Sequence, residues 1–107
     1  MIANVAEETP VEIMRKVFTA ASQGTLDHPT LMMVIKLLND AGNYSLSSEL
    51  LRTWLAHTNS PLLNIVYCDL GDVLLKMNDK TGAEQAYRRS LQINPGNHRA
   101  QVALAVL

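Results

Sequence analysis

The chain has 107 residues, of which 48% are hydrophobic and 5% aromatic, so it is long enough for one small domain with a mainly aliphatic core. Nine basic residues face ten acidic ones, and the formal net charge of -1 excludes the strong positive charge typical of proteins that bind nucleic acid or anionic membranes. The single cysteine, Cys68, excludes a disulfide within the chain and indicates a reducing compartment.

The N-terminal segment does not resemble a signal peptide, because Glu7 and Glu8 interrupt it and no basic start precedes a long apolar run. No stretch approaches the roughly 18 uninterrupted apolar residues of a membrane span. We therefore expect a soluble, cytoplasmic protein without a membrane partner, and a flexible N-terminus over residues 1–8.

Helical spacing of apolar residues, bounded by capping residues and breakers, predicts six helices with short turns. No segment alternates with the period of a β-strand. The first predicted helix opens at Thr9-Pro10 and ends at Gly24. The second begins between Asp27 and Thr30 and ends at the turn 41–43. The remaining four span about 44–57, 61–77, 80–93 and 98–107.

Apolar residues mark one side of the first helix and of the third. In the first helix Val11, Met14, Val17, Phe18 and Ala21 follow at helical spacing, and the third helix should place Trp54 in the core.

An internal repeat connects the later helices. Leu70-Gly71 recurs as Leu104-Ala105, and Pro61 recurs as Pro95, each 34 residues later. A weaker copy with a 36-residue offset places Val34-Ile35 before Leu70-Gly71. Repeats of this length are typical of stacked helix pairs.

The repeat from Tyr67 to Pro95 resembles the tetratricopeptide signature. It reads Tyr67-x2-Leu70-Gly71-x2-Leu74, then Ala83-x3-Tyr87, Ser90 and Pro95. The small residues Gly71 and Ala83 suit a close crossing of two helices, and Tyr87 suits the gap between pairs.

The resemblance implies an all-α fold: a right-handed superhelical stack of antiparallel helix pairs, with about six helices. We expect one domain over residues 9–107, with its clearest repeat at 64–97, a weaker repeat at 28–61 and an incomplete pair from 98. The runs 54–61, 69–75 and 82–91 also look like the N-terminal repeat region of bacterial proteins similar to the SPINDLY and O-linked N-acetylglucosaminyltransferase group.

Residues that could carry catalysis or bind a metal are few. The three histidines, His28, His57 and His98, lie at helix boundaries, lack ligand spacing and are expected to be solvated or capping. Cys68 is expected to be a partly buried structural thiol, and Arg88-Arg89 a solvated pair. We predict no enzymatic activity in this chain, no cofactor and no metal.

In proteins of the tetratricopeptide type, the first helix of each pair lines a concave surface. The resemblance therefore implies a groove in this chain. Its expected lining is Met32, Met33, Lys36, Asp40, Ile65, Asp69, Asp72, Lys76, Arg99 and Val102. Asp69 stands where glycosyltransferase-type repeats carry a peptide-binding asparagine, and Cys68 and Asp72 replace two residues of the set that grips C-terminal carboxylates. An acidic groove is therefore expected, with Asp69 and Asp72 either binding a partner or simply solvated.

The last predicted helix keeps an apolar stripe without a partner helix. We expect the chain to be a piece of a longer protein, and the alternative is a homodimer through this helix. The leading functional hypothesis is a protein–protein interaction scaffold that binds a peptide or helix on its concave face. Its rivals are the non-catalytic N-terminal part of a glycosyltransferase-type protein and a self-association module.

Overall fold

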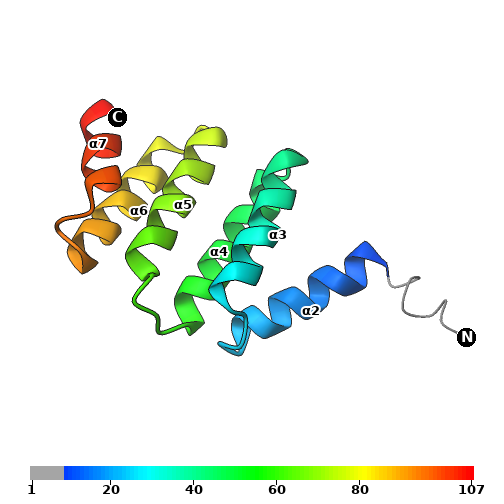
Figure 1. Cartoon of the computed structure of the whole chain (residues 1–107). Helices are drawn as coiled ribbons and strands as arrows, with labels where there is room; N and C mark the ends of the chain where they lie inside the picture. Colours follow the sequence, from blue (N-terminus) through cyan, green and yellow to red (C-terminus); the bar gives the residue numbers. More distant parts are fainter. Residues whose placement is uncertain (1–8) are drawn as a thin grey trace, which may run out of the picture.

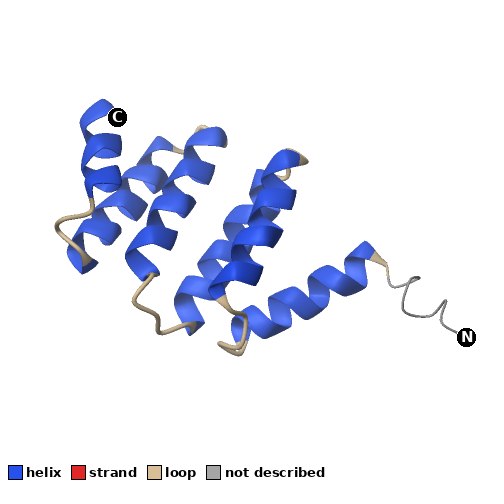
Figure 2. Cartoon of the chain, viewed as in Figure 1, coloured by secondary structure: helices blue, strands red, loops and turns tan. Residues whose placement is uncertain are grey.

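The computed structural model describes residues 9–107, which form six α-helices and, within that range, no β-strand (Figures 1 and 2). The molecule is elongated, with principal extents of 55 × 27 × 17 Å. The predicted flexibility of residues 1–8 lies outside the described residues. The helices are α2 Pro10–Ser22, α3 His28–Asp40, α4 Tyr44–His57, α5 Leu63–Lys76, α6 Lys80–Ile93 and α7 His98–Val106.

Side-chain caps fix the beginnings of four helices. In each case an oxygen of the residue before the helix accepts a hydrogen bond from a backbone N–H in the first turn, as such residues do at helix N-termini. These capping residues are Thr9, Asn43, Asp79 and Asn97. The predicted opening at Thr9-Pro10 is confirmed.

Three of the turns between consecutive helices contain a residue with left-handed backbone. Gly24 and Gly42 have φ of 72° and 74°, a conformation that glycine adopts without strain, and they end α2 and α3 where the sequence predicted. Asn78 takes the same role between α5 and α6 with φ of 61°.

The start of α5 differs from the prediction. The helix begins at Leu63, two residues after Pro61, because Ser60 forms a tight turn first. The Ser60 hydroxyl accepts a hydrogen bond from the Leu62 N–H at 3.1 Å, and its carbonyl accepts one from the Leu63 N–H.

The helices pack largely in chain order. α3 packs on α4, α4 on α5, α5 on α6 and α6 on α7, while α2 skips its sequence neighbour and packs on α4. In Figure 1, α2 runs away from the stack toward its N-terminal end. Val11, which shares the helical spacing of the first helix, therefore does not reach the core: it is 67% exposed, and only the second half of α2, from Val17 to Ala21, contributes to the core.

Trp54 is the largest side chain of the core and is 1% exposed, as predicted. Its indole N–H donates a 2.7 Å hydrogen bond to the Leu26 carbonyl, which ties α4 to the segment that precedes α3. The His28 ring packs edge-on to Trp54, with ring centroids 6.2 Å apart, so His28 is a packing residue as well as a helix-boundary residue.

A buried polar cluster joins the last three helices. The Ser90 hydroxyl of α6 donates to the Asn64 carbonyl of α5 at 2.7 Å, and the Asn97 amide donates to the Asn64 side-chain oxygen at 2.9 Å. Cys68 lies 3.4 Å from the Ser90 hydroxyl and is fully buried, where partial burial was predicted. Because Asn97 also caps α7, this cluster links the start of α7 to the two helices before it.

Gly71 of α5 lies directly against the Tyr87 ring of α6. A Cβ placed on Gly71 would come within 2.6–2.9 Å of three ring atoms, which is closer than real Cβ atoms approach their neighbours. The predicted close crossing of these two helices at Gly71 is therefore confirmed.

Among residues 9–107, no helix is long and apolar enough to cross a membrane.

Replacing Gly71 with alanine should destabilise the fold, because the buried Tyr87 ring has no room to move aside. We expect a loss of about 1–3 kcal/mol in the free energy of unfolding, the usual range for overpacking. Urea denaturation followed by Trp54 fluorescence measures it. Gly96→Ala is the matched control, since a Cβ there meets its nearest atom at an ordinary 3.4 Å; equal stability of the two variants would contradict the packing argument.

Candidate functional site

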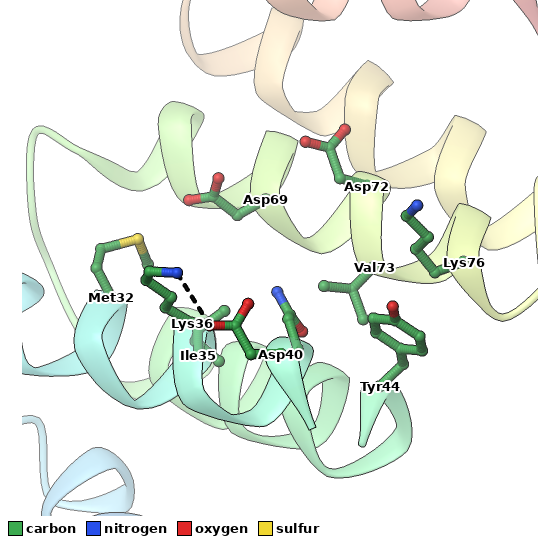
Figure 3. A pocket seen from close by; sticks show the side chains of 10 residues that line it. Met32, Ile35, Lys36, Asp40, Tyr44, Asp69, Asp72, Val73 and Lys76 are labelled. Atoms are coloured by element: carbon green, nitrogen blue, oxygen red, sulfur yellow. Dashed lines mark hydrogen bonds and ion pairs between the residues drawn. The ribbon is translucent and has the colours of Figure 1, made fainter. Parts of the chain in front are cut away.

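A surface cavity of about 410 Å³ lies between α3 and α5 (Figure 3). Six of the residues predicted to face a groove line it: Met32, Lys36, Asp40, Asp69, Asp72 and Lys76. The remaining lining residues are Ile35, Asn39, Tyr44 and Val73.

Apolar side chains from both helices form part of this cavity. Ile35 and Val73 are almost fully buried, with 5% and 3% of their surface exposed, and Met32 and Tyr44 are half-buried beside them. When a ligand removes such a partly covered apolar surface from water, the free energy of binding becomes more favourable by about 25 cal/mol per Å². The cavity can therefore hold an apolar side chain of a partner.

Lys36 and Asp40 form an ion pair along α3. Their side chains lie one helical turn apart, with the ammonium nitrogen 2.9 Å from a carboxylate oxygen, and both are well exposed (Figure 3). Exposed pairs of this kind contribute little to stability, so either residue can exchange its partner for a ligand at small cost.

Asp69 and Asp72 are both paired with Arg99 of α7. The guanidinium donates to an Asp69 oxygen at 2.9 Å and also forms a short hydrogen bond with Asp72. Three residues predicted separately for the groove are thus brought together, although Arg99 itself does not line the cavity. Asp69 is the more enclosed carboxylate, with 20% of its side chain exposed against 52% for Asp72.

The buried position of Asp69 has an electrostatic consequence. Burial raises the pKa of this carboxyl above its ordinary value, and the hydrogen bond and charge of Arg99 act in the opposite direction. One carboxyl oxygen, Oδ2, is buried without a hydrogen-bond partner among the described residues. Without Arg99, the charged form of Asp69 would be disfavoured further.

Tyr87 completes this cluster from α6. Its hydroxyl donates a hydrogen bond to Asp72, and its ring packs under Gly71. Burial, together with the hydrogen bond to Asp72, raises the pKa of the Tyr87 phenol well above its ordinary value, because a phenolate there would be desolvated and next to a carboxylate. Asp72 therefore links α5 to both α6 and α7.

The groove was predicted to be acidic, with Asp69 and Asp72 either binding a partner or solvated, and the structure adds a cation, Arg99, that pairs with both. The two carboxylates are engaged by Arg99, and the charges around the cavity are balanced. Three cations face three carboxylates: Lys36, Lys76 and Arg99 against Asp40, Asp69 and Asp72.

Lys76 is the exception to this pairing. It lines the cavity from the last turn of α5, is exposed, and has no ion pair with any residue between 9 and 107. Its ammonium group is the cation at this cavity that an anionic group of a ligand can reach without displacing a carboxylate of the chain.

Other predicted groove residues do not line the cavity. Met33 and Ile65 are 59% and 41% exposed but lie outside it, and Val102 is 48% exposed on α7. Val106 and Leu107 are exposed beside Val102 at the end of the chain, which is the surface considered for a homodimer. These apolar side chains remain accessible on the described surface.

Four lining residues were not assigned to the groove in advance. Ile35 and Val73 follow Met32 and Asp69 at spacings of three and four, so the helical period alone could have indicated them. Asn39 and Tyr44 flank the turn between α3 and α4, and their place depends on how that turn folds back.

Among the described residues, no group of three or more histidine, cysteine, aspartate or glutamate side chains could hold a metal ion. The chain matches no protein-family model, no curated protein and no solved structure.

The Tyr87–Asp72 hydrogen bond predicts a particular response to alkaline pH. In the unfolded chain the Tyr87 phenol loses its proton near pH 10, whereas in the folded protein it keeps the proton to higher pH. Above about pH 10 the folded state therefore binds more protons than the unfolded state, and the free energy of unfolding falls as pH rises. Tyr87→Phe should lose about 1 kcal/mol at pH 7. Above pH 10 its stability should decline less steeply than that of the wild type.

Urea denaturation at several pH values between 7 and 11 measures both effects, with Tyr67→Phe as the control for a half-buried tyrosine. Parallel pH curves for Tyr87→Phe and the wild type would contradict this account of the phenol.

Proposed function

We propose that the chain is a protein–protein interaction scaffold that binds a peptide or helix in the cavity between α3 and α5. The observation that carries the proposal is the composition of that cavity. It combines partly exposed apolar side chains, Met32 and Tyr44, with one cation, Lys76, that has no counter-ion among residues 9–107.

The proposed architecture is a tetratricopeptide-like stack with a right-handed superhelical twist. Three features support it: the 34-residue recurrence from Pro61 to Pro95, the packing of helices in chain order, and the contact of Gly71 with Tyr87 at the crossing of α5 and α6. In this arrangement α3 and α5 are the first helices of two successive pairs, and the cavity lies on the inner side of the stack.

The charge pairing around the cavity indicates which charge a partner should carry. Asp69 and Asp72 share the one positive charge of Arg99, and Lys36 pairs with Asp40, so Lys76 is the lining cation without a counter-ion among residues 9–107. We propose a partner segment with an apolar side chain that contacts Met32 and Tyr44, and a carboxylate that pairs with Lys76. Ion pairs at such a rim mainly set orientation and association rate, and the apolar contact supplies most of the affinity.

Selection of peptides from a random display library against the wild-type chain tests this proposal. The enriched peptides should carry an acidic residue near an apolar one. Their affinity, measured by fluorescence anisotropy, should fall about tenfold or more in Lys76→Glu, since an attractive charge becomes repulsive.

Lys80→Glu is the matched control, because Lys80 is an exposed lysine at the start of α6 and does not line the cavity. Substitutions at Asp69 or Asp72 are less informative, since they also break the contacts of Arg99. The binding site would be wrong if the selected peptides bound Lys76→Glu and the wild type equally well.

A further inference from the structure

A second surface lies on the opposite side of α5 from the cavity. Tyr67 and Lys76 are nine residues apart, which is two and a half helical turns, so their side chains leave the helix in opposite directions. Around Tyr67, two shallow hollows of about 120 and 220 Å³ adjoin each other and share Arg52, Tyr67 and Leu70 in their lining. We call these two hollows the arginine site.

Two arginines from different helices meet at this site. Arg52 comes from α4 and Arg89 from α6, and both line the smaller hollow beside the Tyr67 ring. The guanidinium carbon of Arg89 lies 6.0 Å from the centroid of that ring, a distance at which a cation is attracted to an aromatic face. The site thus places two permanent positive charges around one aromatic side chain.

Neither arginine is neutralised by the described part of the chain. Arg52 has no ion pair with residues 9–107, and Arg89 donates only to the neutral Gln92 amide oxygen, at 2.9 Å. The neighbouring Arg88 differs, because its guanidinium pairs with Glu84 at 2.8 Å. No acidic residue in the described range lines either hollow.

A ligand with two negative charges would balance the two unpaired arginine charges at this site. Guanidinium groups donate paired hydrogen bonds to phosphate oxygens, and both arginines keep N–H groups available for this. The rest of the lining is neutral: Gln85 offers an amide, and Leu55, Ala56 and Leu70 form an apolar floor for the carbon atoms next to a phosphate.

The surroundings favour a single phosphate over a polyanion. A nucleic acid needs a row of cations, whereas the next basic residue along α6, Arg88, already has a carboxylate partner and the chain as a whole carries a net charge of -1. We propose that Arg52, Arg89 and Tyr67 bind the phosphorylated side chain of a partner protein. This proposal depends on the arginine site alone and does not require the groove of α3 and α5.

The test is a titration followed by ¹⁵N NMR, including the arginine side-chain resonances. Three probes are compared: inorganic phosphate, a capped alanine peptide with a central phosphoserine, and the same peptide with glutamate in its place. We expect the phosphoserine peptide to shift Arg52 and Arg89 signals and to bind about tenfold or more tightly than the glutamate peptide.

Variants identify the residues that bind the probe. Arg52→Gln and Arg89→Gln should each weaken binding of the phosphoserine peptide, and Arg89→Lys should only partly restore it, because lysine keeps the charge and loses the planar fork. Arg88→Gln is the matched control and should bind like the wild type. Since all three arginines are exposed, thermal melts followed by Trp54 fluorescence should confirm that the variants remain folded.

Several results would overturn the proposal. Absence of shifts at Arg52 and Arg89 would show that no phosphate binds there, and equal weakening by Arg88→Gln would show non-specific attraction. Equal affinity for the glutamate peptide would show that the site binds a carboxylate and does not select phosphate. Tighter binding of inorganic phosphate than of the peptide would show that the ligand is a free ion and not a protein partner.

Discussion

The contact of Tyr87 with Gly71 and Asp72 is the constraint on which the C-terminal half of the structure depends. The ring occupies space that any side chain at Gly71 would need, and this fixes how closely α5 and α6 approach. The hydroxyl donates to Asp72, which holds that carboxylate where Arg99 of α7 also reaches it. One buried aromatic side chain therefore sets the helix crossing and orients the charges that attach the last helix.

The same cluster affects the charge of the surface between α3 and α5. Two carboxylates on α5 would by themselves repel an acidic partner and attract a basic one. Because Arg99 reaches from α7 and pairs with both, their two negative charges are partly offset, and Lys76 is left without an ion pair among residues 9–107. The charge of this surface thus depends on a residue of α7, and not only on the residues that line the cavity.

Much of the fold follows from local chemistry. Capping residues such as Asn43 and Asp79, and the left-handed turn at Gly42, place helix ends within about two residues, and the spacing that buries Trp54 is visible in the sequence. What could not be predicted depends on contacts between distant segments. The pairing of Arg99 with Asp69 spans 30 residues and requires α7, which packs on α6, to bring Arg99 within reach of α5, and the exposure of Val11 results from the direction in which α2 leaves α4.

Through their contacts with Arg99, Asp69 and Asp72 hold α7 in place. A double-mutant cycle with Asp69→Ala and Arg99→Ala, measured by urea denaturation, tests it most directly. Arg99 is half exposed and Asp69 largely enclosed, so the coupling energy should be favourable and about 0.5–1 kcal/mol. Additive effects of the two substitutions, with no coupling beyond experimental error, would contradict the claim.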